Sequence, residues 1–488
     1  MIDFLNQLHS YVTPFMLTVY AIIILVVVIV IVLENRSPLK TLSWIMVLLL
    51  LPGLGFVFYV FFGQNFRKEK IIARKGLKNH ERLLSLANAQ INKMSEGNLL
   101  DNTAANHKRN IVQLLLNNSY SLITIGNKVT VFHNGADKFE ALLNAMGNAK
   151  KFIHLEYYIF EEDEVGNRIK RLLIQKVAQG VEVRLIVDDV GSWELKDKFF
   201  KEMEDAGIEA GSFLKVRFPW LTSKVNYRNH RKIVVIDGEV GFMGGINVAD
   251  RYLDGHESYG IWRDTHMMIE GDAVNSLQTT FLIDWYFVKQ VELAHPHYFP
   301  SKTPVGDKIV QIVSSGPDSD WPAIMMGIFQ AIATARDYVY ISTPYFMPND
   351  HVLMAIKTAA LGGVDVHLLI PSKSDAYVTL LSSRSYLRDL MESGVKVSFY
   401  DKGFLHCKTI VVDDVLSLIG SANMDFRSFE QNFEVTSFIY DEEVAIEMRN
   451  VFLNDLNDST RIYPEVWVRR PLNEKAKESF ARLLSPLL

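Results

Sequence analysis

Two short stretches of this 488-residue chain decide its fold, HRKIVVID at residues 230–237 and HCKTIVVD at residues 406–413. Each stretch contains a His, a Lys two positions later and an Asp after four further residues. An Asn follows each His by 17 residues, at Asn247 and at Asn423. A long pattern that occurs twice with the same spacing is not expected by chance. It indicates that the chain contains the same structural unit twice.

The sequence around the two motifs repeats as well. Residues 149–160 (AKKFIHLEYYIF) resemble residues 335–346 (ARDYVYISTPYF), and residues 179–187 (QGVEVRLIV) resemble residues 362–370 (GGVDVHLLI). The offsets of 186 and 183 residues predict duplication of a whole unit rather than a short-repeat array. Strand-like runs alternate with helix-like runs, which predicts an α/β fold with largely parallel strands. The strands alone leave open the alternative of two unrelated α/β units.

The spacing within each motif has a geometric meaning. Residues i and i+2 of a strand point to the same face, so the His and the Lys of each motif should project together. The residue between them should point away. The projecting pairs are His230 with Lys232 and His406 with Lys408, and the intervening residues are Arg231 and Cys407. We expect Cys407 to be a small buried residue rather than a nucleophile.

Brought face to face, the two motifs would place two His, two Lys and two Asn around one point. Such a set suits a phosphate group, because ammonium and amide groups can hold its oxygens. One imidazole can attack phosphorus, and the other can protonate the leaving oxygen and later deprotonate the acceptor. We assign His230 as the nucleophile and His406 as the acid–base group, and the near-symmetry of the two motifs leaves the reverse assignment as an alternative. This chemistry requires no metal or other cofactor.

The duplicated motif resembles that of the phospholipase D superfamily over about residues 119–462. The resemblance implies two α/β/α sandwich repeats related by a pseudo-twofold axis, an active site between them and a covalent phosphohistidine. It implies catalytic roles for the two His, the two Lys and the two Asp residues, with supporting roles for Asn247 and Asn423. It also implies an acidic residue that orients each His, which we expect to be Glu434 in the second half and Asp264 in the first. The catalytic set so predicted is His230, Lys232, Asp237, His406, Lys408 and Asp413.

The N-terminal part carries two apolar runs, at residues 15–33 and 41–62. A membrane span needs about 20 apolar helical residues, so the runs predict a transmembrane hairpin. A cleaved signal peptide is disfavoured because residues 1–14 contain neither Lys nor Arg. Six basic residues between positions 67 and 78 predict a cytoplasmic catalytic part, although Arg36 and Lys40 oppose this orientation.

The hairpin combined with the twin motifs resembles the bacterial cardiolipin synthases of this superfamily. That resemblance implies an enzyme of the bacterial cell membrane, multi-pass, that joins two phosphatidylglycerol molecules and releases glycerol. A phosphatidyl hydrolase and a membrane-tethered nuclease remain as alternatives, and a membrane scaffold with a dead site is disfavoured by the intact motifs. A net charge of −5 argues against a protein that mainly coats nucleic acid, and a single cysteine excludes a disulfide scaffold.

The predicted organisation has five parts. They are a transmembrane hairpin (1–63), a helical connector (64–118), repeat 1 (119–300), repeat 2 (301–462) and a C-terminal tail (463–488). Two segments could face a membrane. Residues 211–232 interleave aromatic and basic residues, and residues 472–484 could form a helix with Phe480, Leu483 and Leu484 on one face. For both segments, packing within the protein is the competing interpretation.

Overall fold

The structure is a computed structural model of the chain. It describes residues 2–33, 38–51, 53–59, 77–97, 100, 104–216 and 226–487. The chain forms two compact units, one of residues Met1–Glu69 with Phe218–Lys224 and one of residues Lys70–Arg217 with Val225–Leu488.

The described residues of the first unit form three helices. They are α1 (Ile2–Leu33), α2 (Pro38–Leu50) and α3 (Leu54–Phe58). Ile24 and Ile31 of α1 form a small buried cluster with Leu48 and Tyr59, while most other apolar side chains described here are exposed. In the described part of the chain, no helix has both the length and the apolar character needed to cross a bilayer. The helical content agrees with the expectation, whereas the transmembrane hairpin is not confirmed.

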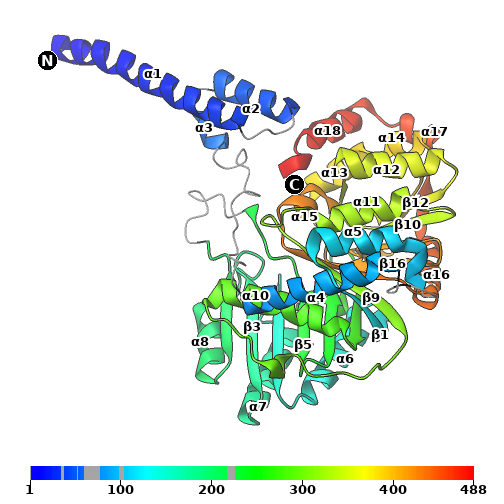
Figure 1. Ribbon diagram of the computed structural model, residues 1–488. Helices are drawn as coiled ribbons and strands as arrows, with labels where there is room; N and C mark the ends of the chain where they lie inside the picture. Colours follow the sequence, from blue (N-terminus) through cyan, green and yellow to red (C-terminus); the bar gives the residue numbers. More distant parts are fainter. Residues whose placement is uncertain are drawn as a thin grey trace. The chain divides into compact units, whose positions relative to one another are not determined.

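The second unit is built on one 15-stranded sheet (Figure 1). Its first half runs outward from the centre in the order β1 (Ile123–Phe132), β8 (His266–Glu270), β6 (Val240–Gly244), β5 (Ile233–Ile236), β2 (Phe152–Tyr157), β3 (Glu182–Asp188) and β4 (Glu209–Phe213). Its second half runs β9 (Lys308–Ser315), β18 (Glu434–Ile439), β16 (Leu416–Gly420), β15 (Thr409–Val412), β10 (Tyr338–Ser342), β12 (Asp365–Pro371), β13 (Lys396–Tyr400) and β19 (Ser459–Ile462).

The two halves have the same strand order, apart from the extra edge strand β19, and they join where β1 pairs with β9. This order supports the predicted duplication. The expectation of largely parallel strands is wrong. Only the β2–β3–β4 and β10–β12–β13 groups are parallel, and the other described neighbours in this sheet are antiparallel. The reason is local, because the motif strands continue through short turns into hairpins, and a hairpin pairs antiparallel.

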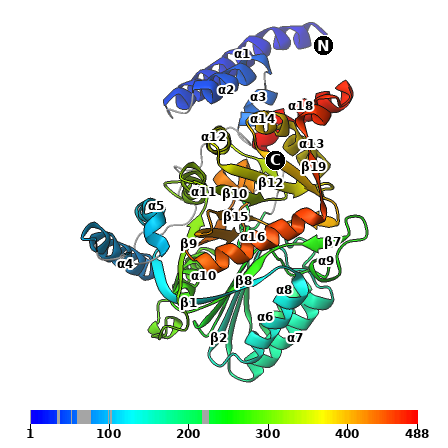
Figure 2. The same cartoon turned by 90° about the vertical axis from the view of Figure 1, so that its right-hand side faces the viewer.

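Helices cover both faces of the sheet, as expected for an α/β/α sandwich (Figure 2). In the first half the helices are α6 (Gly135–Gly147), α7 (Glu164–Ala178), α8 (Asp197–Asp205), α9 (Arg251–Asp254) and α10 (Ala273–Lys289). In the second half they are α11 (Ala323–Ala333), α12 (Asp350–Leu361), α13 (Tyr377–Ser385), α14 (Leu387–Glu392), α15 (Phe426–Glu430) and α16 (Glu442–Asn457). One large apolar core lies in each half, with Phe139 and Leu173 in the first and Ile328 and Ile356 in the second.

Shorter elements complete the unit. The predicted connector contains α4 (Lys78–Ser95), a 3₁₀ turn (Ala104–Lys108) and α5 (Arg109–Ser119), and the C-terminal tail contains α17 (Pro464–Val468), α18 (Leu472–Leu483) and a 3₁₀ turn (Ser485–Leu487). A further 3₁₀ turn is Pro296–Tyr298. Two small parallel pairs lie outside the main sheet, β7 (Ile261–Arg263) with β14 (Gly403–Leu405) and β11 (Phe346–Met347) with β17 (Met424–Asp425).

Candidate active site

A single cavity of about 510 Å³ contains both motif histidines in its wall. His230 and Asn247 come from the first half of the sheet, and His406 and Asn423 come from the second. The expectation that the two imidazoles share one cavity is therefore met. Each His lies immediately before a hairpin, β5–β6 in one half and β15–β16 in the other, and the returning strand leads to the Asn.

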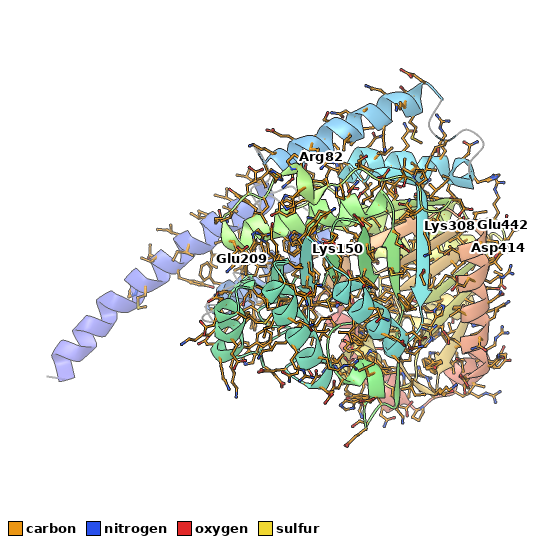
Figure 3. All side chains as sticks on the ribbon, turned by 90° about the horizontal axis from the view of Figure 1, so that it is seen from below. Arg82, Lys150, Glu209, Lys308, Asp414 and Glu442 are labelled. Carbon is orange, nitrogen blue, oxygen red and sulfur yellow. The ribbon has the colours of Figure 1, made fainter. Side chains whose placement is uncertain are left out.

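Both motif aspartates lie in the hairpin turns that follow the motif strands, rather than beside the two histidines. Asp237 accepts hydrogen bonds of 2.7–2.9 Å from the backbone N–H groups of Lys150, Lys151 and Phe152, at the start of β2. Asp413 bonds the backbone at the start of β10 in the same way, and Lys108 donates to it at 3.0 Å. Figure 3 labels Lys150 and Asp414, which lie beside these two turns in different halves of the sheet.

Neither aspartate belongs to the cavity wall formed by the described residues. Both have φ of 55°, in the left-handed region, where a short polar side chain that bonds the nearby backbone is favoured. We therefore correct their predicted catalytic role. Each aspartate fixes the turn of its hairpin to the neighbouring strand and so sets the position of the strand that follows the His and the Lys.

The backbone of each histidine segment is held by the opposite half. His230 N–H donates to the Phe433 carbonyl at 2.9 Å, and Phe433 N–H donates to the Arg228 carbonyl at the same distance. His406 N–H donates to the Arg263 carbonyl at 2.7 Å, where β14 pairs in parallel with β7. Each histidine segment is thus bound to the backbone of the opposite half.

The side chains cross in the same way. The Nδ1 atom of His230 lies 3.0 Å from the Glu434 carboxylate, and the Nδ1 atom of His406 lies 2.6 Å from the Asp264 carboxylate. The sequence identified both acids correctly but predicted that each would orient the His of its own half. The structure reverses this pairing. A carboxylate that accepts from Nδ1 leaves Nε2 of the same ring for chemistry.

The two motif lysines lie behind the histidines rather than in the described cavity wall. Lys232 donates to the carbonyl of His230 at 2.7 Å, and Lys408 donates to the carbonyl of His406. Burial lowers the pKa of Lys232 to about 7 and also lowers the pKa of Lys408. Burial thus disfavours the charged form of both lysines, and each amino group holds the backbone carbonyl of the His two positions before it.

Burial also lowers the pKa of both imidazoles. The pKa of His406 falls to about 4, through burial first and then through the charge of Lys408. The pKa of His230 is lowered mainly by burial, while Glu434 opposes the change. Burial alone would raise the pKa of each carboxyl group, but the neighbouring cations and hydrogen bonds lower the pKa of Asp264 and of Glu434 below their ordinary values. Both acids are thus favoured as carboxylates.

The two asparagines differ in their bonding. Asn247 accepts from the Ile159 N–H at 3.1 Å and donates to the Tyr252 hydroxyl at 2.6 Å, so its amide is held in place. The side-chain carbonyl oxygen of Asn423 is buried and has no hydrogen-bond partner among the described residues. Both line the cavity, as predicted.

Sequence reasoning missed part of the cavity wall. Arg228 and Arg427 line the cavity, as do Tyr252 and Asp375. Two tyrosines at strand ends also line the cavity. Tyr158 packs edge-on against His230 with ring centroids 4.9 Å apart, and Tyr345 donates to Asp375 at 2.6 Å. The sequence contained a signal for Arg228, because it lies two residues before His230 and therefore on the same side of an extended chain.

Two further residues near the site have structural roles. Asp188 belongs to a local polar network in which it accepts from Arg228 at 3.1 Å and from the Asn229 N–H at 2.8 Å. Cys407 is buried and accepts from the Thr265 hydroxyl at 3.5 Å. Burial raises the pKa of this thiol to about 11, so it is a poor nucleophile.

The aromatic and basic segment before the first motif is only partly described. Phe213 and Tyr227 are buried, and Phe213 packs against Phe287 and Phe433. For these residues the core interpretation is correct. Residues 217–225, which include most of the predicted membrane-facing loop, lie outside the described residues.

A duplicated sheet with one cavity between its halves, and one His and one Lys from each, defines the class of phospholipase D-like proteins. The family model "Cardiolipin synthase, PLD-like domain" matches residues 142–285 and 328–456, and the model "Phospholipase_D-nuclease N-terminal" matches residues 19–64. The chain belongs to the PLD-like cardiolipin synthase family.

Curated relatives agree with this assignment. Cardiolipin synthase 2 of Bacillus cereus is 43% identical over 460 residues, which are 93% of this chain and 88% of that protein. Cardiolipin synthase of Listeria monocytogenes is 41% identical over 459 residues, which are 93% of this chain and 95% of that protein. Among solved structures, phosphatidylserine synthase of Haemophilus influenzae is similar in fold with a TM-score of 0.59, at 15% identity over 79% of this chain and all of that one.

Proposed function

We propose that this protein is a cardiolipin synthase, a phosphatidyltransferase that joins two phosphatidylglycerol molecules and releases glycerol. The observation that carries the proposal is the placement of His230 and His406 in the wall of one cavity, each with its Nδ1 atom next to a carboxylate of the opposite half. Membership of the cardiolipin synthase family supports the choice of substrate.

The first step transfers the phosphatidyl group to the enzyme. Nε2 of His230 attacks the phosphorus of the first phosphatidylglycerol, and a P–N bond forms. The P–O bond to the terminal glycerol breaks, and the leaving oxygen takes a proton from Nε2 of His406. The products of this step are a phosphohistidine, free glycerol and a neutral His406.

The second step transfers the phosphatidyl group to the acceptor. Neutral His406 removes the proton from the terminal glycerol hydroxyl of a second phosphatidylglycerol, and that oxygen attacks phosphorus. The P–N bond to His230 breaks, so the imidazole is regenerated and cardiolipin is released. His406 ends the cycle with the proton that it needs for the next one.

The hydrogen-bond geometry supports His406 as the acid–base group. Its carboxylate partner Asp264 is the closer of the two, at 2.6 Å, and accepts one further bond from the Thr265 N–H, whereas Glu434 also accepts from the side chains of both Ser421 and Asn432. A near and less shared carboxylate stabilises an imidazolium better. The pKa of about 4 belongs to the site without substrate. An anionic phosphate beside the ring opposes the charge of Lys408 and raises this pKa, which allows His406 to carry a proton when glycerol leaves.

The charge that builds on the non-bridging oxygens needs donors near the phosphorus. Lys232 and Lys408 supply positive charge from behind the two histidines, and Asn423 has an amide in the cavity wall. Arg427 and Arg228, the latter paired with Asp188, also line the cavity and offer further N–H donors. Charged donors fixed in a buried site stabilise such a transition state because they need no reorganisation.

We further propose that the protein is attached to the bacterial cell membrane by its N-terminal helices. Exposed apolar side chains on α1 and α2, among them Leu25, Val26 and Leu49, support this attachment. Two spans with a cytoplasmic catalytic part remain a prediction. Protease treatment of sealed inside-out vesicles tests it, since digestion of the catalytic part is expected there and protection is expected in intact cells stripped of their wall.

The decisive experiment is an assay of the purified full-length protein in detergent with phosphatidylglycerol as the only lipid. We expect cardiolipin and glycerol in equal amounts. Phosphatidic acid as the main product would favour the phosphatidyl hydrolase, because water would then be the acceptor in the second step. A His406→Ala preparation serves as the control for contaminating activity.

A further inference from the structure

The C-terminal helix α18 is docked on the second half by one of its faces. Glu478 and Ala481 are buried on this face. The hydroxyl groups of Ser382 in α13 and of Ser485 lie 2.7 Å apart, and the Arg482 guanidinium lies over the Tyr386 ring at 4.3 Å from its centroid. Figures 1 and 2 both show α18 beside α13 and α14.

The opposite face of α18 is apolar and exposed. Leu472, Phe480 and Leu483 are 81%, 67% and 74% exposed. At about 100° per residue these three positions fall on one side of the helix, roughly opposite Glu478 and Ala481. We call Leu472, Phe480 and Leu483 the outer stripe. Three large apolar side chains held in solvent on a docked helix indicate a surface that contacts another apolar phase.

Positive charge accompanies the outer stripe. Residues 461–488 contain six Lys and Arg but three Asp and Glu, whereas the whole chain has a net charge of −5. Lys477 and Arg469 are exposed. Glu478 forms an ion pair with Arg470, so this pair adds little to the surface charge and leaves five cations and two acids. Apolar side chains flanked by cations fit a bilayer that contains anionic lipid.

The outer stripe is also connected to the catalytic cavity. Helix α13, on which α18 packs, begins at Tyr377, and its neighbours Asp375, Ala376 and Thr379 line the cavity. Tyr377 itself is 63% exposed. Helix α13 therefore both supports α18 and reaches the cavity wall at its N-terminal end.

We propose that the outer stripe docks on an anionic lipid bilayer and holds the cavity against the surface from which it takes phosphatidylglycerol. This inference rests on the proposed function, since it concerns how that substrate reaches the site. It adds a second membrane contact, formed by the catalytic unit itself and independent of the N-terminal helices.

Site-specific fluorescence quenching tests this contact directly. Cys407 is buried, so Phe480→Cys and Leu483→Cys can be labelled selectively with bimane. Val305→Cys is the matched control because Val305 is an apolar residue that is 49% exposed. Its backbone N–H donates to Gly126 in the first part of β1, whereas the other end of β1 pairs with His266. The full chain is reconstituted in vesicles with brominated acyl chains, made either of phosphatidylglycerol with phosphatidylcholine or of phosphatidylcholine alone.

We expect at least twofold quenching at positions 480 and 483 in the phosphatidylglycerol vesicles, weaker quenching in phosphatidylcholine alone and none at position 305. Absence of quenching at 480 and 483 in both vesicles overturns the proposal.

A variant with two acidic residues in the outer stripe separates this inference from the proposed function. We expect the Phe480→Glu/Leu483→Glu protein to lose at least tenfold in cardiolipin formation from long-chain phosphatidylglycerol in vesicles. With a short-chain phosphatidylglycerol below its micelle concentration, its activity should equal that of the unsubstituted protein and of Val305→Glu. Equal loss on both substrates contradicts the docking surface. Failure of the unsubstituted protein to make cardiolipin from either substrate would contradict the proposed function instead.

Discussion

The two halves of the catalytic unit present almost the same groups to one cavity, but different residues support those groups. Between the motif His and Lys, the first half has Arg231 and the second has Cys407. Arg231 is fully buried and forms an ion pair with Asp284, which lies next to Glu156. Cys407 lies in a small apolar cluster with Leu405.

A second difference lies at the residue that follows the returning strand. Gly245 leaves room for the Asp264 carboxylate, because a Cβ atom there would overlap it. The equivalent Ser421 uses its hydroxyl to donate to Glu434. The surroundings of the two histidines are therefore asymmetric even though the fold is a duplication, which allows one imidazole to act as nucleophile and the other as acid and base.

The largest effect is expected from the crossed carboxylates. Asp264→Asn should reduce cardiolipin formation by about a hundredfold to ten-thousandfold, since the partner of His406 no longer holds its tautomer or stabilises its charge. Glu434→Gln should have a similar effect through His230. In NMR titrations, Asp264→Asn should lower the pKa of His406 and leave His230 nearly unchanged. A shift at His230 instead would contradict the crossed pairing.

The intervening residues should differ in their effect on stability. Arg231→Met leaves Asp284 buried without its cation, and the free energy of unfolding should fall by about 3–5 kcal/mol. Cys407→Ala removes only a small buried group and should cost about 1 kcal/mol. Denaturant unfolding of the full-length protein measures both. The Arg231→Met/Asp284→Leu double variant is the control, and it should recover part of the loss because no unpaired charge remains.

Substitutions of Gly245 and of Ser421, the residues after the two returning strands, should lower kcat to different extents. Gly245→Ala pushes the Asp264 carboxylate away from His406, so kcat should fall by about tenfold or more. Ser421→Ala removes one hydrogen bond to Glu434 and should reduce kcat only about threefold to tenfold. Steady-state assays with phosphatidylglycerol compare the two. An equal loss in both variants would show that the two supports are equivalent.

The smallest effect concerns pH. The folded-state pKa of His406, about 4, lies below its ordinary value of about 6.5, so the unfolded chain binds the proton more readily. This contribution to stability is fully present above pH 6.5 and is lost as the pH falls toward 4. His406→Gln should flatten the fall in unfolding free energy over this interval more than His230→Gln does. If His230→Gln flattened it more instead, His230 of the first half would be the imidazole with the more strongly lowered pKa.

Much of the fold and of the site could be predicted from the sequence. The twin motifs identify the duplication, and the family resemblance points to both carboxylates, although Asp264 lies 34 residues after its motif His and Glu434 lies 28 residues after the other. The crossed pairing of Asp264 and Glu434 could not be predicted, since it depends on long-range contacts. His230 and Glu434 are 204 positions apart, and His406 and Asp264 are 142 positions apart. The backbone partners of Asp237 were missed for the same reason, because they lie 85–87 positions away in sequence, at the start of β2.

The central claim is that one His from each half acts on the same phosphorus, and covalent trapping tests it most directly. Full-length protein is mixed rapidly with ³²P-labelled phosphatidyl-p-nitrophenol and quenched in alkaline denaturant, because phosphohistidine is labile in acid. p-Nitrophenol needs no proton to leave, so His406→Ala should accumulate label on His230 without turning over. His230→Ala should form no adduct. Label on His406 in the unsubstituted protein would reverse the assignment, and an adduct in neither protein would contradict the account.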